Sequence, residues 1–478
     1  MLFNSLHFLL FFIITTLIYY VIPHKHRWLL LLLISCYFYM VFVPIYILIL
    51  GFTIIIDYYA GIWIEQEVGN RRKLYLIISL VTNIGILAIF KYYNFINTNI
   101  TTVIGTVGYQ NPVPFLSILL PIGLSFHTFQ AMSYTIEVYR GKQKAEKHFG
   151  IYALYVMFYP QLVAGPIERP QNILPQLRKP IAYDENLIIE GIQMMIWGLF
   201  KKVVVADRLS VLVDTVYSNP NGFGGFANLL AAVFFSIQIY CDFYGYSDIA
   251  LGTAKVLGFD LIKNFNIPYI SKSINEFWQR WHISLSTWFR DYLYISLGGN
   301  RNGKWKTYRN VLAVFMISGL WHGANWTFVI WGTIHGILII IERLLKIDKF
   351  KTNNKIIQIL QTSITFGIVT GAWIFFRAKN VNEAFSIYKA IFTRFSLNKA
   401  AIIEPIFAIT SDNTAISHFI VCLIGILILF FVEFKMNIQQ QVVFADKPRK
   451  QMAFYSMIIF LILFLGYFKN NTFIYFQF

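Results

Sequence analysis

Residues 6–20 read LHFLLFFIITTLIYY, a stretch that is apolar almost throughout. Residues 74–95 and 452–467 repeat the same character. These stretches approach the ~20 apolar residues that a helix needs to cross the hydrocarbon core of a bilayer. We therefore expect an all-α polytopic membrane protein with roughly 11–13 transmembrane helices.

Composition supports the same fold class. Hydrophobic residues make up 57% of the 478 positions and charged residues 13%, whereas ordinary soluble domains carry about 25% charged residues. The net charge of +17 does not indicate a nucleic-acid partner, since membrane proteins concentrate Lys and Arg in cytoplasmic loops. The three cysteines, Cys36, Cys241 and Cys422, lack metal-site spacing, so we expect free thiols and no bound metal.

Basic clusters predict the orientation of the N-terminal spans. Residues 25–27 and 71–73 are separated by two apolar stretches with a turn at Val43 and Pro44, which places both clusters in the cytosol and the N-terminus outside. The uncharged segment 97–114 is then expected to be an outer loop, followed by a span over 115–138.

The same rule assigns the later basic clusters to the cytosol and the C-terminus to the outer face. These clusters occupy 301–309, 346–355 and 435–450.

Between 159 and 309 the apolar stretches become short and are broken by Pro, Gly and charged residues. This pattern predicts half-helices, re-entrant turns and interfacial helices. Because irregular backbone at membrane depth must be surrounded by protein or a water-filled cavity, we expect the site there. We interpret 1–478 as one domain, with N-terminal helices over 1–114, a catalytic core over 115–345 and C-terminal helices over 346–478.

His322 is the first candidate for catalysis. It lies in the segment 318–326, SGLWHGANW, about a dozen residues after Arg309, which at ~1.5 Å rise per residue places it near the middle of the membrane. Gly319 and Gly323 allow a backbone or a substrate to approach closely. An imidazole accepts a proton from a hydroxyl at neutral pH. We therefore expect His322 to be a catalytic base, and the alternative is a hydrogen-bonded core histidine.

His282 is the second candidate. Residues 275–291 read NEFWQRWHISLSTWFRD, and a helical period places apolar residues and His282 on one face of an amphipathic helix. The expected face comprises Trp278, Trp281, His282, Leu285, Trp288 and Phe289. His282 is then a polar group that orients donor or acceptor, or else a residue packed among aromatic rings.

A wider set of residues is assigned to substrate or donor binding. Arg280 and Arg290 flank the expected face, and they either clamp a phosphate or reach lipid headgroups. Two aspartates, Asp242 and Asp248, allow acid–base work or structural hydrogen bonding. His127 and His335 either line the cavity or serve packing. The binding set is Trp278, Arg280, Trp281, Arg290, Asp291, Trp321, Asn325, Asp242 and Tyr246.

Several of these segments together resemble the membrane-bound O-acyltransferase family, and within it the bacterial alginate and peptidoglycan O-acetyltransferase branch. The resemblance runs from about Pro121 to His335 and extends more loosely over the whole length. The segments that carry it are 159–170, 241–248, 264–288, Trp321-His322-Gly323 and the terminal FIYFQF of 473–478.

The resemblance implies that His322 is catalytic and that His282 is the second polar position. It also implies helices around a funnel with a narrow tunnel, in a bacterial cell (inner) membrane. The expected donor is cytosolic acetyl coenzyme A, with no tightly bound cofactor. The expected acceptor is a cell-surface polysaccharide, reached with the help of an extracytoplasmic acetyltransferase- or esterase-like partner protein.

Three rival functions stay open. Within the same family, D-alanyl transfer to teichoic acid uses a different donor. A polysaccharide or lipid transporter also contains half-helices and buried polar groups, but transporters usually show repeated halves, and this sequence shows none. A structural scaffold for polysaccharide export would tolerate replacement of His322.

Overall fold

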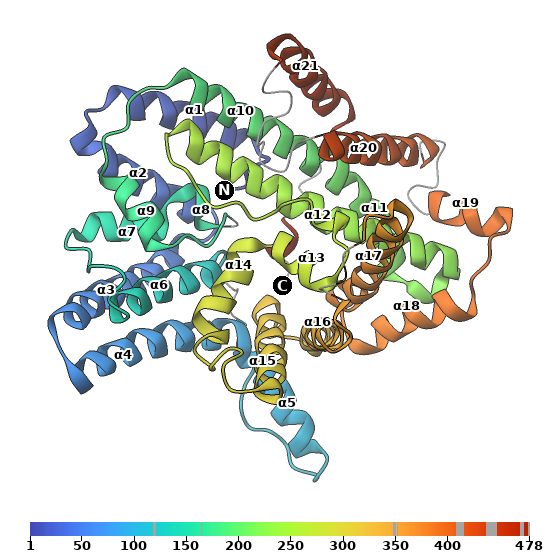
Figure 1. Cartoon of the computed structure of the whole chain (residues 1–478), viewed down its shortest axis with the longest axis horizontal. Coiled ribbons are helices and arrows are strands. Elements are labelled where there is room, and N and C mark those ends of the chain that lie inside the picture. Colours follow the sequence, from blue (N-terminus) through green and yellow to red (C-terminus); the bar gives the residue numbers. More distant parts are fainter. Residues whose placement is uncertain are drawn as a thin grey trace. The chain divides into compact units, whose positions relative to one another are not determined.

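A computed structural model describes residues 1–117, 121–163, 165–347, 350, 352–407, 415–435, 447–468 and 473–476. Every regular element within these ranges is a helix (Figure 1). Seven of the described helical segments are long and apolar enough to cross a membrane. The prediction of an all-α polytopic membrane protein is therefore confirmed.

The chain forms two compact units. The first comprises Met1–Gly191 and Ala250–Ile262, and the second comprises Ile192–Ile249 and Lys263–Phe478. Two long helices, α10 (Glu185–Leu199) and α12 (Gly225–Val256), contribute residues to both units.

The first unit is built around three neighbouring helices, α3, α4 and α6 (Figure 1). A buried carboxylate, Asp57 of α3, accepts hydrogen bonds from Ser79 and Asn83 of α4 at 2.6–3.0 Å, so α3 and α4 are joined by a polar cluster inside an apolar bundle. The helices are α1 (Leu6–Val21), α2 (His24–Met40), α3 (Ile47–Gln66), α4 (Gly69–Leu87), α5 (Tyr93–Gly105), α6 (Leu124–Tyr139), α7 (Phe149–Met157), α8 (Tyr159–Leu162) and α9 (Pro170–Arg178).

Two predicted boundaries in this unit are wrong. The expected outer loop over 97–114 begins as helix, because α4 continues through a π turn (Ala88–Tyr92) into α5. Its polar residues support the helix: the hydroxyl of Thr101 returns to the carbonyl of Asn97 at 2.8 Å. The expected span over 115–138 is helical only from Leu124, after Gly123 with φ 78°, and residues 118–120 lie outside the described part.

The second unit is built around α12, with two lysines on the neighbouring π-helix (Phe200–Ala206) paired to its aspartates. A Cβ on Gly198 would lie 2.5 Å from the carbonyl oxygen of Gly245, so α10 and α12 touch backbone to backbone. Its helices are α11 (Asp207–Ser218), α13 (Ile274–Arg280), α14 (Ile283–Trp288), α15 (Lys304–His322), α16 (Trp326–Leu345), α17 (Lys355–Arg377), α18 (Val381–Thr393), α19 (Lys399–Phe407), α20 (Ala415–Lys435) and α21 (Pro448–Leu465).

The 32 residues of α12 correct the expectation that the whole of 159–309 consists of short pieces. Breaks occur where prolines and glycines cluster, as between α8 and α9, but the glycines within α12 serve helix contacts instead. The C-terminal segment ends in a short turn, Ile474–Phe476.

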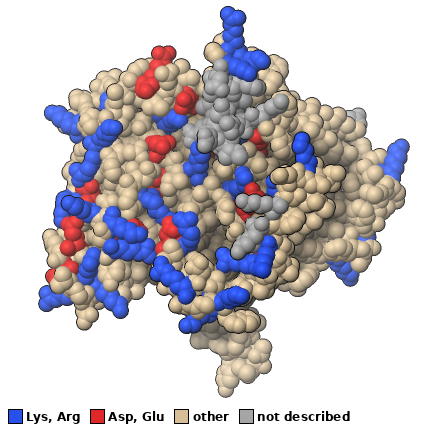
Figure 2. Space-filling view, viewed as in Figure 1, with Lys and Arg blue, Asp and Glu red and all other residues tan. Residues whose placement is uncertain are grey.

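Large apolar side chains cover much of the surface. Leu17, Val81, Ile356 and Leu427 are each at least 63% exposed, as expected for helices solvated by lipid rather than water. In Figure 2, basic and acidic side chains are interspersed among broad uncharged areas. Of the predicted cytosolic loop 435–450, residues 436–446 lie outside the described part.

Candidate active site

His322 lies at the tip of a helical hairpin formed by α15 and α16. The two helices are joined by only three residues, and glycines bring them into backbone contact. A Cβ on Gly319 would lie 2.2 Å from the carbonyl oxygen of Phe328, and a Cβ on Gly332 would lie 2.1 Å from that of Phe315. The prediction that Gly319 permits close backbone approach is confirmed. The hairpin therefore fixes His322 against residues of α16.

Aromatic rings enclose the His322 imidazole, whose residue is 4% exposed. The distances between ring centroids are 5.0 Å to Trp321, 5.1 Å to Trp331, 5.3 Å to Phe376 and 5.5 Å to Tyr475. Such an enclosure excludes bulk water, which strengthens hydrogen bonds made inside it.

His282 lies at a break between α13 and α14, so the predicted continuous helix over 275–291 is wrong. Its backbone is left-handed, with φ 43°, which a non-glycine residue adopts only when its surroundings impose it. Asn264 supplies that restraint: its carbonyl accepts the Ile283 N–H at 2.9 Å and its side-chain oxygen accepts the Ser284 hydroxyl at 2.6 Å. Sequence periodicity missed this contact because Asn264 belongs to a preceding irregular segment.

The break turns the His282 ring inward, where it is completely buried. Its centroid lies 4.6 Å from Phe243 and 6.4 Å from His322. His282 lies outside the seven candidate spans, and burial lowers the pKa of its imidazole from the usual 6.5 to about 3. The ring is therefore neutral at physiological pH.

Tyr475 completes a group of three rings, His282, His322 and Tyr475, which we call the catalytic cluster because it contains both histidines predicted to be catalytic. The centroid of Tyr475 lies 5.5 Å from His322 and 6.5 Å from His282. Its hydroxyl is buried and has no hydrogen-bond partner among the described residues. The sequence analysis used the terminal FIYFQF only as a family signature and did not select its tyrosine as a candidate site residue.

Asp242 and Tyr246, both assigned to the binding set, contact the C-terminal segment that carries Tyr475. The Asp242 carboxylate accepts the Ile474 N–H at 2.7 Å. The Tyr246 ring stacks on Phe473 with centroids 4.6 Å apart. Trp321 contacts both histidine rings, at 5.0 Å and 6.3 Å.

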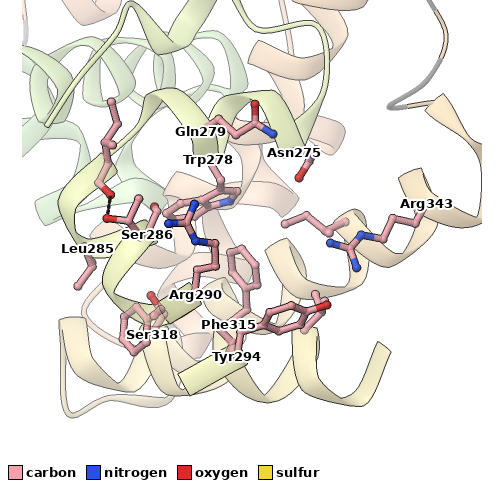
Figure 3. A pocket seen from close by; sticks show the side chains of 16 residues that line it. Asn275, Trp278, Gln279, Leu285, Ser286, Arg290, Tyr294, Phe315, Ser318 and Arg343 are labelled. Atoms are coloured by element: carbon pink, nitrogen blue, oxygen red, sulfur yellow. Dashed lines mark hydrogen bonds between the residues drawn. The ribbon is translucent and has the colours of Figure 1, made fainter. Parts of the chain in front are cut away.

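A pocket of about 530 Å³ lies between α13, α14 and the α15–α16 hairpin. Of the binding set, it brings together Trp278 and Arg290 and adds Arg343, which sequence reasoning did not select. In Figure 3, Arg290 and Arg343 approach the pocket from different helical segments. The remaining lining includes Asn275, Gln279, Ser286, Thr287, Tyr294, Phe315 and Ser318.

Other members of the binding set lie outside this lining. Arg280 pairs with Glu276 at 2.9 Å, and Asp291 pairs with Arg290 at 2.8 Å. Trp281 is 1% exposed and packs on Phe277, with centroids 5.4 Å apart.

Asn325 begins α16, where its side-chain oxygen accepts the Thr327 N–H at 3.1 Å. This is an N-cap, which satisfies one of the backbone donors that every helix start leaves open. Its assignment to ligand binding stays a prediction.

The two further histidines each have a hydrogen-bonding neighbour within their own unit. In the second unit, His335 accepts the indole N–H of Trp278 at 3.3 Å and so joins α16 to α13. In the first unit, His127 lies 3.3 Å from the Thr53 hydroxyl.

The sequence of the chain is similar to those of known proteins. The sequence model of the membrane-bound O-acyltransferase family matches residues 147–380, which include both histidines of the cluster. A protein of Pseudomonas aeruginosa named probable alginate O-acetylase AlgI is 40% identical over 396 residues, covering 82% of this chain and 75% of that one. The peptidoglycan O-acetyltransferase of Helicobacter pylori is 34% identical over 388 residues, covering 76% and 73%.

A more distant similarity extends to the teichoic acid D-alanyltransferase of Bacillus subtilis, which is 30% identical over 274 residues, 54% of this chain and 69% of that protein. The identities and coverage, together with the all-helical fold, show that this chain belongs to the membrane-bound O-acyltransferase family.

Proposed function

We propose that the protein transfers an acetyl group from a cytosolic thioester, acetyl coenzyme A, toward hydroxyls of an extracytoplasmic polysaccharide. The observation that carries the proposal is the catalytic cluster, in which a buried imidazole, His322, lies beside a second imidazole and a buried tyrosine hydroxyl. Similarity to acetyltransferases of alginate and peptidoglycan covers far more of the chain than similarity to the D-alanyltransferase, which favours acetyl as the group transferred.

His322 is proposed as the general base. It takes the proton of the accepting hydroxyl as the oxygen attacks the thioester carbonyl carbon. The new C–O bond forms, the C–S bond breaks, and the proton passes from His322 to the departing thiolate. General base catalysis by a positioned histidine contributes ~10²–10⁴-fold to the rate.

His282 is proposed to stabilise the oxyanion that develops on the carbonyl. A neutral imidazole carries one N–H donor, and its left-handed backbone and the Asn264 contacts hold the ring in place before the reaction. This preorganisation contributes to the rate, because a donor that must first reorient stabilises the transition state less.

The pocket between α13, α14 and the hairpin is proposed as the donor site. Its volume of about 530 Å³ is within the ~300–1,000 Å³ typical of small-molecule sites. Arg290 and Arg343 supply guanidinium groups suited to the phosphates of coenzyme A. Two tryptophan rings connect the pocket to the cluster. The ring centroid of Trp278, which lines the pocket, lies 5.7 Å from that of Trp331, and the centroid of Trp331 lies 5.1 Å from that of His322.

The proposed orientation follows from the same hairpin. Helix α15 begins and α16 ends beside the basic stretches 301–309 and 346–355, and an antiparallel hairpin brings these ends together. Because positive charges favour the cytosolic side, Arg343 and the pocket are proposed to face the cytosolic donor. Both chain termini are proposed to lie outside, as the alternation of the basic clusters along the sequence predicts. An extracytoplasmic acetyltransferase- or esterase-like partner is proposed to complete delivery to the polymer.

The test measures ester-linked acetate on purified surface polysaccharide from cells whose native copy is replaced by variants at equal membrane level. His322→Ala and His322→Gln are expected to reduce the acetate to background. His127→Gln is the matched control, because it also removes a buried imidazole, and it is expected to retain most of the acetate. Unchanged acetate in both His322 variants would overturn the proposal and favour a transporter or scaffold.

A further inference from the structure

The C-terminal segment 473–476 enters the catalytic cluster from a distant part of the sequence. Phe473 and Ile474 are 0% and 3% exposed. Tyr475 then contacts His322, His282 and Phe376 at centroid distances of 5.5, 6.5 and 6.1 Å. The segment therefore forms one wall of the space around the two histidines.

One backbone contact fixes this wall to the rest of the unit. The Ile474 N–H donates to one carboxylate oxygen of Asp242 at 2.7 Å. The other oxygen of Asp242 lies 2.5 Å from the ammonium group of Lys202, which also lies 2.9 Å from Asp207. All three charged residues are at most 3% exposed. The segment is thus held by a buried ionic group rather than by apolar packing alone.

The charges explain why the segment is held so firmly. A buried carboxylate is tolerated only when its charge is compensated and its oxygens accept hydrogen bonds. Lys202 compensates Asp242 through one carboxylate oxygen and also pairs with Asp207. The remaining Asp242 oxygen therefore favours a donor, and Ile474 provides one in a charge-assisted hydrogen bond.

The same turn of α12 also supports His282. Tyr246 lies four residues after Asp242 and three after Phe243, so it neighbours both on the surface of α12. Phe243 contacts the His282 ring at 4.6 Å and the Tyr475 ring at 4.7 Å, while Tyr246 stacks on Phe473 at 4.6 Å. This face of α12 joins the C-terminal segment to the catalytic cluster.

We propose that Asp242, compensated by Lys202, is a positioning residue that seats the segment 473–476 as a water-excluding wall of the acyl-transfer site. The proposal rests on the proposed acyltransferase function. Its consequence is chemical: with the wall in place the thioester meets only the accepting hydroxyl, and without it water attacks the same carbonyl carbon, releasing acetate and coenzyme A thiol.

The test uses the full-length protein in lipid nanodiscs with acetyl coenzyme A and compares thiol release with acetyl transfer. Asp242→Ala is expected to lower transfer at least tenfold and to raise the ratio of thiol release to transfer. The charge-balanced double variant Asp242→Asn with Lys202→Gln keeps an oxygen that accepts the Ile474 N–H. It is expected to restore the native ratio, which a purely structural defect would not allow.

Hydrogen exchange of the C-terminal peptide provides a second, direct measurement. The Ile474 amide is expected to be protected in the native protein and in the double variant, and to exchange at least tenfold faster in Asp242→Ala. Native protection in Asp242→Ala, or an unchanged ratio of thiol release to transfer after removal of residues 473–478, would overturn the proposal. If acetate persists in His322→Ala, the proposed function itself fails, which is a distinct result.

Discussion

Substitution of Gly332 by Ala tests the geometry of the hairpin that carries His322. The added Cβ would lie 2.1 Å from the carbonyl oxygen of Phe315 in the facing helix. Because the clash is with a backbone atom, rotation of a side chain cannot relieve it. Relief to about 3 Å requires α15 and α16 to separate by ~1 Å, and overpacking of this kind costs ~1–3 kcal/mol.

The separation also moves His322 away from Trp331, because these residues lie on opposite arms of the hairpin. A misplacement of ~1 Å at a reacting group costs ~10²-fold in rate. Gly332→Ala is therefore expected to lower acetylation about 10²-fold while much of the protein remains folded.

Gly367→Ala is the matched control. Gly367 also lies within a long helix of the second unit, α17, but an added Cβ would meet no described atom within 4 Å. Alanine favours helix over glycine by up to ~1 kcal/mol, so this variant is expected to keep native activity and a native or higher melting temperature. The assay is polymer-bound acetate at matched membrane level, with thermal unfolding of the purified protein in detergent. Native activity and native melting temperature in Gly332→Ala would refute the close-contact argument.

Three further predictions follow from the site and its surroundings. Tyr475→Phe keeps the ring of the cluster but removes its hydroxyl, and it is expected to lower polymer acetylation at least ~10-fold; native acetylation would exclude a chemical part for that oxygen. Arg343→Ala is expected to raise the KM for acetyl coenzyme A several-fold with a smaller change in kcat, because a phosphate contact in the pocket acts on binding; an unchanged KM would remove this residue from the donor site. Burial raises the pKa of Glu168 to about 7 from the usual 4.5, so the folded state retains its proton more strongly and stability is lost as pH rises from ~4.5 through ~7. Melting temperatures measured from pH 5 to pH 8 are expected to decline less in Glu168→Gln than in the native protein. Parallel melting curves against pH for the variant and the native protein would contradict the raised pKa of Glu168.

Local sequence was sufficient to select His322. Its segment combines a histidine, two glycines and two tryptophans within an apolar region. Ionisable residues in such regions are energetically costly, and those that occur usually have a function. Gly319 of this segment permits the close backbone approach that the sequence predicted, whereas the hairpin and the matching contact at Gly332 were seen only in the structure.

Periodicity was insufficient for His282. The pattern of 275–291 predicts a continuous amphipathic helix, yet the helix is interrupted at 281–282. The break is held by hydrogen bonds that Ile283 and Ser284 donate to Asn264, a residue of an irregular segment 18 positions before His282. No local helical period contains that information. The same break orients α14, which lines the pocket, and Arg290, which follows α14 and also lines it.

The sequence by itself predicted a helical membrane protein and selected His322 as the leading catalytic candidate. These properties are local, because hydrophobic length and a lone ionisable residue in an apolar stretch are read within about twenty residues. Only the tertiary structure decided that Tyr475 completes the cluster and that Asp242 and Lys202 hold its segment. The hydrogen bond between Ile474 and Asp242 joins residues 232 positions apart. Such contacts form because buried charges and backbone donors need partners, and the fold can supply these from any part of the chain.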